Sequence, residues 1–382
     1  MGITLRYVLI LLPIVVGAVV FAMTVQPDPA PPPDAPAKTP EAASAKSDAS
    51  APVTRVAVKP PPEIAFDEED RAFEERLEEI GSGFGGTVGI AVVDVETGRV
   101  YEYNGTKLLP QQSVSKLWVA LAALGQVDGG SFDLNEKVTI RREDLVLFYQ
   151  PIRDIVRSRG SFATDFRDLM ERALARSDNA ANDRLLRRVG GPDAVQNWID
   201  DRDLNGVRFG TDERAKQSKI AGLQWRQDYS YGNAFYEARD NVPTEKRRKA
   251  FETYLDDPID GATPIGIAKA LGALARGELL SEPSTRLIRE ILSTTKSGPR
   301  RIKGGAPSGW SVDHKTGTGQ FFGGEQSGYN DVGIITAPDG SEYAIAVMIG
   351  RTRESTPSRM AMMQSVTRAT ADFHDTREAG EE

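Results

Sequence analysis

The sequence contains no cysteine and only two histidines, His314 and His374. The absence of cysteine excludes disulfide bonds, a thiol nucleophile, thiolate metal sites and a lipid-modified cysteine anchor. Two histidines are too few for a zinc site built from several of them, and we expect neither a metal nor another cofactor. A Ser-His-Asp triad would have to use one of the two, and His374 sits in a charged tail. A hydrolase of this composition must therefore take its base from lysine or from a carboxylate.

The chain also lacks an excess of basic residues. Acidic residues outnumber basic ones by 55 to 47, which gives a formal net charge of −8. Such a chain offers no large basic surface, so we expect no nucleic-acid partner. Its 382 residues, of which 40% are hydrophobic, suffice for one large domain or two modest ones.

Charged residues are missing from residues 7–23, an apolar run that follows Arg6. As a helix this run would measure about 25 Å, which is short of a bilayer core or just matches it. We predict that residues 1–25 are a signal peptide or an N-terminal membrane anchor, with residues 7–23 as the tether. Residues 26–64 are rich in Pro, Ala, Ser and Asp, a composition that predicts a disordered linker. Export would place the remaining domain, residues 65–377, in the periplasm.

Strand and helix patterns are unevenly distributed within this domain. A helical pattern over residues 67–80 precedes a strand-like hairpin over residues 87–103. The following region, up to about residue 257, reads as mainly helical. Strand patterns return only from residue 310 onward. The sheet is therefore predicted to come from both ends of the domain, with helices inserted between them.

Ser113 and Lys116 form an S-x-x-K motif at the start of an apolar helix predicted over residues 117–124. Residues three apart lie on one helix face, and the first turn of a helix has free backbone N–H groups. A serine hydroxyl is a weak nucleophile until a base takes its proton, and a partly buried lysine can be that base. Because the pattern recurs from Ser293 to Lys296, the motif alone is a weak signal.

Two further motifs follow along the chain. An S-D-N motif at residues 177–179 lies after an amphipathic helix, and on its own it also fits a helix-capping turn. A K-T-G-T motif at residues 315–318 extends a strand into a glycine-rich segment, where a ligand could approach the backbone closely. On its own this third motif also fits a glycine-rich hairpin.

The three motifs, in this order, are the signature of class A β-lactamases and penicillin-binding proteins. The chain resembles the class A branch over residues 66–373, and the segments 189–192 and 330–333 add to the similarity. The resemblance implies an α+β fold of the β-lactamase/transpeptidase type. One lobe would be an antiparallel sheet flanked by helices, residues 65–110 and 260–377. The other lobe, residues 111–259, would be all helical, with the site between the lobes.

The resemblance also implies the role of each motif residue. Ser113 would attack the lactam carbonyl, and Lys116 would hold the proton network. Backbone N–H groups of Ser113 and Thr318 would form the oxyanion hole. Ser177 would pass a proton to the leaving nitrogen, and Lys315 would supply positive charge. The residues implied to bind the substrate are Asn179, Thr316, Gly317, Thr318 and Gln217. An arginine often assists with the substrate carboxylate, and Arg351 and Arg359 are both candidates.

A glutamate on a loop activates the water for deacylation in class A enzymes. It belongs to an E-x-x-L-N motif about 34 residues after the asparagine of S-D-N. Counting from Asn179 leads to Glu213, which we predict to be this base. Gln217 occupies the position of the family's asparagine and retains an amide.

The same loop departs from the family pattern in several ways. Lys216 replaces the leucine, and Thr211 replaces the arginine that closes the loop, although Asp260 matches that arginine's partner. Asp183 replaces a common asparagine. The chain also carries an insertion within residues 218–256, which could cover the loop or reshape the cleft.

The sequence therefore predicts a serine β-lactamase that acts as a monomer on a small molecule. Its acyl-enzyme on Ser113 would be hydrolysed by water that Glu213 activates. One alternative is a peptidoglycan D,D-peptidase, which shares the three motifs, acts on stem peptides and needs no Glu213. Another alternative is a penicillin-binding module without hydrolytic activity.

Overall fold

The computed structural model describes residues 66–381. The predicted signal peptide or anchor, its apolar run and the predicted linker all lie outside these residues. Within residues 66–381, no helix is both long and apolar enough to cross a bilayer.

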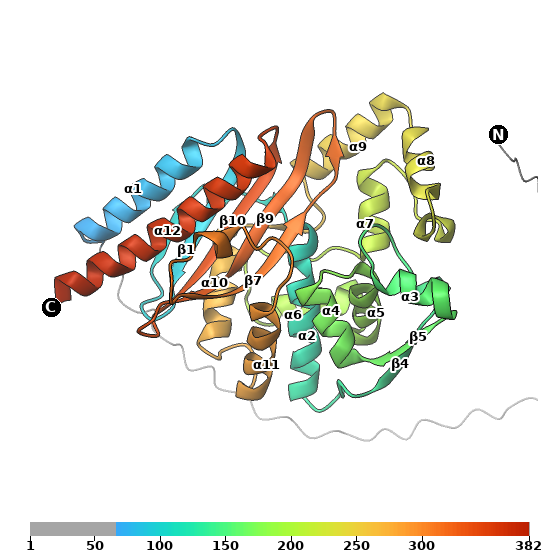
Figure 1. Ribbon diagram of the computed structural model, residues 1–382, viewed down its shortest axis with the longest axis horizontal. Helices are drawn as coiled ribbons and strands as arrows, with labels where there is room; N and C mark the ends of the chain where they lie inside the picture. The colour runs from blue at the N-terminus through green and yellow to red at the C-terminus, as the bar shows by residue number, and fades with distance from the viewer. Residues whose placement is uncertain (1–65, 382) are drawn as a thin grey trace, which may run out of the picture. The chain divides into compact units, whose positions relative to one another are not determined.

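A six-stranded sheet forms the centre of the first lobe, and its strands come from both ends of the described chain (Figure 1). Every pairing in it is antiparallel, as predicted, in the order β2-β1-β10-β9-β7 with the short β8 beside β9. The strands are β1 (Gly86–Asp94), β2 (Val100–Tyr103), β7 (Ser311–Thr318), β8 (Phe321–Phe322), β9 (Glu325–Thr336) and β10 (Glu342–Thr352).

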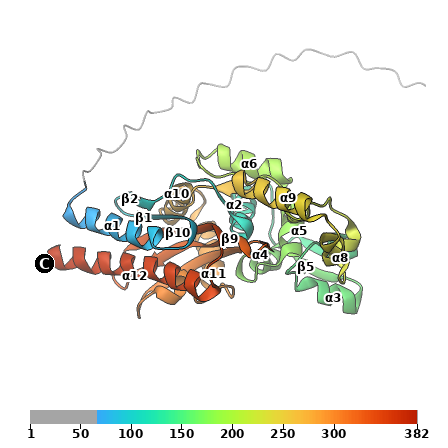
Figure 2. The same ribbon diagram turned by 90° about the horizontal axis from the view of Figure 1, so that it is seen from above.

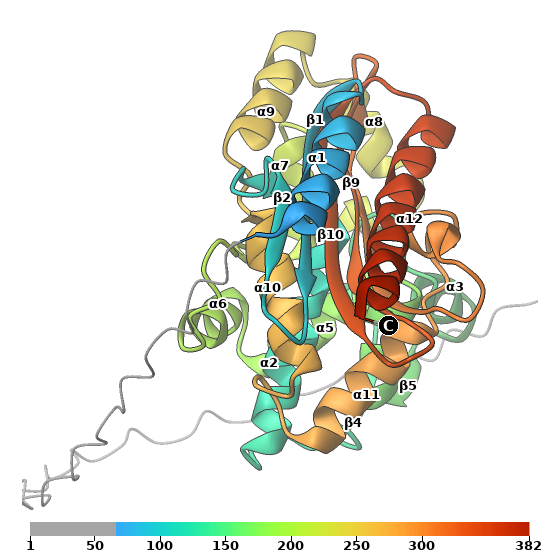
Figure 3. The ribbon, with the colours of Figure 1, turned by 90° about the vertical axis from the view of Figure 1, so that its left-hand side faces the viewer.

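Alternation along β1 explains why helices cover both faces of the sheet. Val88, Ile90 and Val92 belong to one buried apolar cluster, whereas Ala91 and Val93 belong to another. Successive side chains of a strand point to opposite faces, so both faces are apolar and need a cover. Figure 3 shows α1 (Glu68–Ser82) and α12 (Thr356–Glu381) side by side over one face. The other face packs against α10 (Pro264–Ala275).

The second lobe is built around α2 (Lys116–Asp128), whose first nine residues are all buried. A helix that is buried all round needs neighbours on every side, and α2 contacts α4, α5, α6 and α11 (Figure 2). The helices of this region are α3 (Ile152–Arg159), α4 (Phe166–Ala175), α5 (Asn179–Val189) and α6 (Pro192–Asp200), and α11 (Glu282–Ser293) lies between them and β7 of the sheet.

This lobe is not entirely helical, which corrects one detail of the prediction. Strands β4 (Lys137–Ile140) and β5 (Phe162–Asp165) form a two-stranded antiparallel ribbon at its edge. Val138 and Ile140 are buried while Lys137 is exposed, so the alternation exists but is only four residues long. Two residues at the junction of the lobes, β3 (Leu109–Pro110), pair with β6 (Gly261–Ala262).

The insertion folds against the loop that carries the predicted base. It follows α7 (Glu213–Ile220) and contains α8 (Ala234–Asp240) and α9 (Thr244–Asp256). Tyr229 and Phe235 share a buried cluster with Leu147, whereas Phe251 and Tyr254 pack on Ile220 at the end of α7. The insertion therefore packs against the end of α7 through a buried apolar contact.

Candidate active site

Ser113 lies in a single 3-10 turn, Gln112–Ser115, that leads directly into α2. Gln112 has a positive φ of 55°, a conformation that non-glycine residues adopt only when their surroundings hold it. Its backbone N–H donates to Asp260 Oδ2 at 2.9 Å, and its side-chain amide donates to the Tyr254 hydroxyl at 2.7 Å. The strained turn is thus anchored on both sides, and it leaves Ser113 half-buried at the cavity wall.

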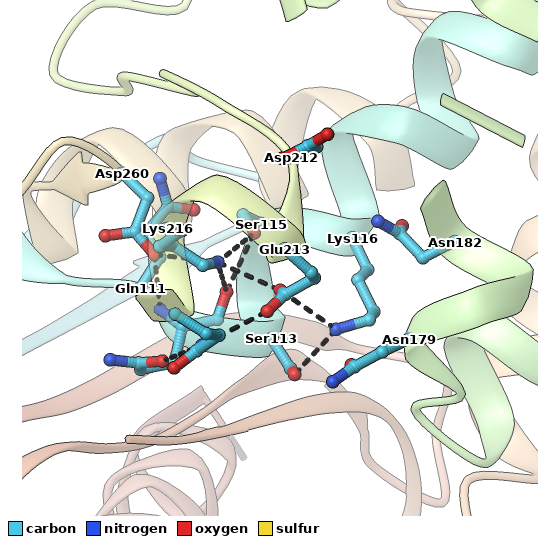
Figure 4. A network of polar contacts seen from close by, with 12 residues as sticks. Gln111, Ser113, Ser115, Lys116, Asn179, Asn182, Asp212, Glu213, Lys216 and Asp260 are labelled. Atoms are coloured by element: carbon cyan, nitrogen blue, oxygen red, sulfur yellow. Dashed lines mark hydrogen bonds and ion pairs between the residues drawn. The ribbon is translucent and has the colours of Figure 1, made fainter. Parts of the chain in front are cut away.

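Lys116 is the partner of Ser113, as the motif predicts. Its Nζ lies 2.7 Å from Ser113 Oγ, and its side chain is fully buried (Figure 4). Burial lowers the pKa of Lys116, although the nearby Glu213 carboxylate opposes that shift. A lowered pKa increases the neutral fraction of the amine, which can accept the proton of a serine hydroxyl.

The S-D-N motif places two side chains in the cavity. Asp178 caps α5 by accepting hydrogen bonds from the backbone N–H groups of Ala180 and Ala181. The motif therefore also forms the helix-capping turn that its sequence fits. Ser177 precedes it with a φ of 59° and lines the cavity, as does Asn179. The Asn179 amide donates to the carbonyl of residue 147 at 2.9 Å, which fixes its orientation.

Strand β7 brings the third motif to the same cavity. Lys315 Nζ donates to Ser177 Oγ at 3.1 Å, and burial, reinforced by the charge of Lys116, holds the pKa of Lys315 well below its usual value. Thr316 and Thr318 line the cavity, whereas Gly317 faces the nucleophile turn. A Cβ at Gly317 would lie 2.3 Å from the backbone carbonyl oxygen of Gln111, just before that turn. Glycine is therefore needed here for close packing.

The arginine at this end of the cavity is Arg301, which the sequence analysis did not identify. Arg301 donates to Thr318 Oγ1 at 2.6 Å and stacks over the Tyr329 ring at 3.7 Å. Neither candidate named from the sequence lines the cavity: Arg351 pairs with Glu252 on α9, and Arg359 donates to Gln326 at 3.0 Å. Arg301 reaches the threonines because it lies in the loop before β7, whereas Arg351 lies in β10 and Arg359 lies in α12.

Glu213 is the first residue of α7 and lies beside Lys116, where the count along the loop predicts it (Figure 4). Its Oε1 lies 3.2 Å from Lys116 Nζ and 2.9 Å from Lys216 Nζ. Burial alone would raise the pKa of Glu213, but attraction to the two lysines outweighs burial and lowers it strongly. The carboxylate is therefore ionised at neutral pH, as a general base must be.

Gln217 completes the surroundings of this carboxylate. Its amide donates to Glu213 Oε2 at 3.1 Å and to Gln112 Oε1 at 3.0 Å. Its own oxygen accepts a hydrogen bond from Gln320 at 3.0 Å. The amide orientation is therefore fixed by three side chains from separate segments.

Asp183 on α5 lies behind Glu213. Its Oδ1 accepts a hydrogen bond from the Glu213 N–H at 3.2 Å, and its Oδ2 has no hydrogen-bond partner among residues 66–381. Burial, followed by repulsion from Asp212 and Glu213, raises the pKa of Asp183 to about 7. The folded protein therefore binds this proton more tightly than the unfolded chain, so the contribution of Asp183 to stability falls as pH rises toward 7. Below that pH the group is neutral, like the asparagine common at this position.

The motif residues surround a cavity of about 840 Å³, large enough for a drug-sized molecule. Ser113, Ser177 and Glu213 all line it, and Arg239 of α8 extends it toward the insertion. Arg176 and Lys296 are exposed at its mouth, and neither side chain forms an ion pair within residues 66–381. Aromatic side chains complete the wall, namely Phe148, Tyr149 and Phe321.

Other candidates from the sequence lie away from this cavity. His314 Nδ1 lies 2.9 Å from an Asp331 oxygen inside the sheet, and no serine hydroxyl among residues 66–381 hydrogen-bonds to His314 to complete a Ser-His-Asp triad. Ser293 donates to a backbone carbonyl at the end of α11, so the second S-x-x-K match does not present a nucleophile. Among residues 66–381, the one group of side chains that could hold a metal ion lies outside the cavity lining: Asp339, His374 and Glu378.

Comparison with known proteins gives consistent matches. A model of the Beta-lactamase enzyme family matches residues 72–373. The extended-spectrum beta-lactamase PER-1 of Pseudomonas aeruginosa is 29% identical over 300 residues, which cover 78% of this chain and 86% of PER-1. Beta-lactamase FAR-1 of Nocardia farcinica is 27% identical, covering 75% and 78%. The crystal structure of a beta-lactamase from Chitinophaga pinensis superposes with a TM-score of 0.65 at 26% identity, covering 79% of this chain and 98% of that one.

Proposed function

This chain belongs to the Beta-lactamase enzyme family, and from that membership we propose that it is a serine β-lactamase. It hydrolyses the β-lactam amide through an acyl-enzyme on Ser113 and so confers resistance to the antibiotic. One observation carries the proposal above all others: Lys116 Nζ lies 2.7 Å from Ser113 Oγ and 3.2 Å from Glu213 Oε1. A single amine thus joins a nucleophile to a carboxylate that a D,D-peptidase does not need.

In the first half of the reaction, Ser113 Oγ attacks the lactam carbonyl carbon. Its proton passes to Lys116, and the oxyanion is held by the N–H groups of Ser113 and Thr318, each worth roughly 3 kcal/mol. The lactam C–N bond then breaks, Ser177 delivers its proton to the nitrogen, and the proton that Lys116 took from Ser113 passes to Ser177 in its place. Lys315 Nζ donates a hydrogen bond to Ser177 Oγ at 3.1 Å and so orients that hydroxyl for the transfer.

In the second half, a water molecule attacks the ester carbon while Glu213 takes its proton. The strongly lowered pKa of Glu213 supports this role, because the carboxylate stays ionised over the working pH range. Gln217, which donates to Glu213 Oε2, would orient that water together with the carboxylate. Collapse of the intermediate returns the proton to Ser113 Oγ and releases the opened lactam.

Turnover of nitrocefin by the purified protein tests the proposal. We expect many product molecules per protein molecule, because Glu213 provides a base for deacylation. Product that stops at one equivalent, with a stable adduct visible by mass, would favour the D,D-peptidase or the non-hydrolytic penicillin-binding module instead.

Arg301 is proposed to bind the substrate carboxylate together with Thr316 and Thr318. A hydrogen bond to a charged group is worth about 1.5–3 kcal/mol, so Arg301→Gln should raise KM about 10- to 100-fold for carboxylated β-lactams. Steady-state kinetics measure the effect, with Arg351→Gln as the matched control because Arg351 lies outside the cavity lining. If Arg351→Gln raised KM as much as Arg301→Gln, the assignment would be wrong.

We propose that the protein is exported to the periplasm, where it acts as a monomer. Residues 1–25 would serve as a signal peptide or anchor, residues 26–64 as a linker, and residues 65–377 as the catalytic domain. The apolar run at residues 7–23 and the Pro/Ala-rich stretch behind it support this organisation. Cell fractionation tests it, since an active pool confined to the cytoplasm would contradict export. Sedimentation of the purified protein tests the monomer.

A further inference from the structure

A second lysine is buried in the site, one helical turn after Glu213. The side chain of Lys216 is only 1% exposed, and its Nζ lies 2.9 Å from Glu213 Oε1 and 3.2 Å from Asp260 Oδ2. The same Nζ lies 3.3 Å from the carbonyl oxygen of Gln112 and 3.5 Å from Ser115 Oγ. A buried ammonium is costly unless it is paired and hydrogen-bonded. Here its partners come from the base's helix, from the nucleophile's turn and from Asp260 just before β6.

Asp260 links this lysine to the turn that carries Ser113. Its Oδ2 accepts the backbone N–H of Gln112 at 2.9 Å, while its Oδ1 accepts the Tyr254 hydroxyl at 2.9 Å. Gln112 is therefore bound at its N–H by Asp260 and at its carbonyl by Lys216. Lys216 and Asp260 together therefore fix the backbone of Gln112, the residue directly before the nucleophile.

We propose that Lys216 is a positioning residue for deacylation. Its ammonium, shared between Glu213 and Asp260, fixes the Glu213 carboxylate and ties α7 to the turn of Ser113. This inference rests on the proposed β-lactamase activity. Lys216 thereby closes the loop through its ion pair with Asp260. Thr211, which replaces the family's loop-closing arginine, cannot form such a pair.

The charges around Glu213 decide how the effect would be measured. Lys216 keeps its proton: burial disfavours the charge, but attraction to Glu213 and Asp260 outweighs burial and raises the pKa of Lys216. Without this cation the pKa of Glu213 would rise. The pKa of Lys116 would rise as well, because a like charge would be lost. The other titratable groups that face this cluster are Asp183 and Asp212, Lys315 from β7 and Tyr254 from α9.

The test is the pH dependence of kcat for a penicillin whose deacylation limits turnover, as shown by accumulation of the acyl-enzyme. Lys216→Met keeps most of the side-chain volume and removes the charge. An opposite charge within this distance shifts a carboxyl pKa by about 1 to 3 units. We therefore expect the acid limb of the profile to move to higher pH by about that amount. Lys219→Met is the matched control, since Lys219 lies on the same helix but is exposed, and its profile should not move.

Asp260→Asn separates positioning by charge from general loosening of the loop. Without the Asp260 carboxylate, Lys216 pairs with Glu213 alone, and the repulsion between the two carboxylates is lost. The pKa of Glu213 should fall, so the acid limb should move to lower pH. A loosened loop would lower the rate at every pH, or displace the limb in the same direction in both variants, and either result would overturn the proposal. If Lys216→Met does not fold, Asp260→Asn decides alone, because an unmoved or raised limb contradicts the inference. Absence of turnover in the unaltered protein would instead refute the proposed function, so the two failures are distinguishable.

Discussion

Replacing Ser113 by alanine should lower kcat/KM for nitrocefin by about 10⁵- to 10⁶-fold, as is found for serine nucleophiles whose partners act as a unit. Lys116 lies 2.7 Å from Ser113 Oγ, and within residues 66–381 no other serine hydroxyl hydrogen-bonds to that amine. Without the hydroxyl, Lys116 has no nucleophile to deprotonate, and the oxyanion hole has no tetrahedral intermediate to stabilise. Initial rates of nitrocefin hydrolysis measure the effect.

The position of the adduct provides the control for this prediction. Intact mass after incubation with a slowly hydrolysed β-lactam should show one adduct, and peptide mapping should place it on Ser113. Ser293→Ala, which alters the second S-x-x-K match, should behave like the unaltered protein. Labelling that persists in Ser113→Ala, or that maps to Ser293, would contradict the assignment.

Glu213→Gln should slow deacylation much more than acylation. Glutamine keeps the size of the side chain and its contact with Gln217 but cannot take a proton from water. General-base catalysis contributes typically 10²- to 10⁴-fold, so we expect kcat to fall by about that factor. The variant should release one burst of product from a penicillin and then remain as an acyl-enzyme visible by mass.

The neighbouring carboxylate supplies the comparison for this second experiment. Asp212 caps α7 by accepting the Ala215 N–H at 2.9 Å, and it does not line the cavity. Asp212→Asn should therefore turn over without an accumulating adduct. Normal turnover in Glu213→Gln, or stalling in Asp212→Asn instead, would show that the base has been assigned to the wrong residue.

The local part of the site could be predicted because its geometry follows from short spacing. Ser113 and Lys116 are three residues apart at a helix start, so their proximity follows from helix geometry alone. Ser177 and Lys315 are 138 residues apart, and their contact at 3.1 Å could be expected only from the order of the motifs. Counting along the loop led to Glu213, which lies beside Lys116 in the fold, because the insertion begins after it.

The remaining contacts depend on how distant segments pack, and single-sequence patterns do not contain that information. Arg301 stands beside another arginine in a loop without periodicity, so nothing in the sequence distinguishes it. Lys216 replaces a leucine of the family motif, and only the fold shows that its Nζ lies 3.2 Å from Asp260 Oδ2. Tyr254 lies in the insertion, yet its hydroxyl accepts a hydrogen bond from the amide of Gln112, 142 residues earlier in the chain. The short ribbon of β4 and β5 was missed because four residues carry too little alternation.

The exposed cations at the cavity mouth affect how fast a substrate arrives. The whole chain carries a formal charge of −8, which repels anionic β-lactams at long range. Arg176 and Lys296, exposed on the cavity lining and without ion-pair partners in the described part of the chain, place two positive charges there that attract an anionic substrate. Such focusing accelerates diffusional encounter, and salt screens it over a Debye length of about 8 Å at physiological ionic strength. Added salt should therefore reduce the second-order rate constant for capture while leaving the chemical steps inside the cavity almost unaffected.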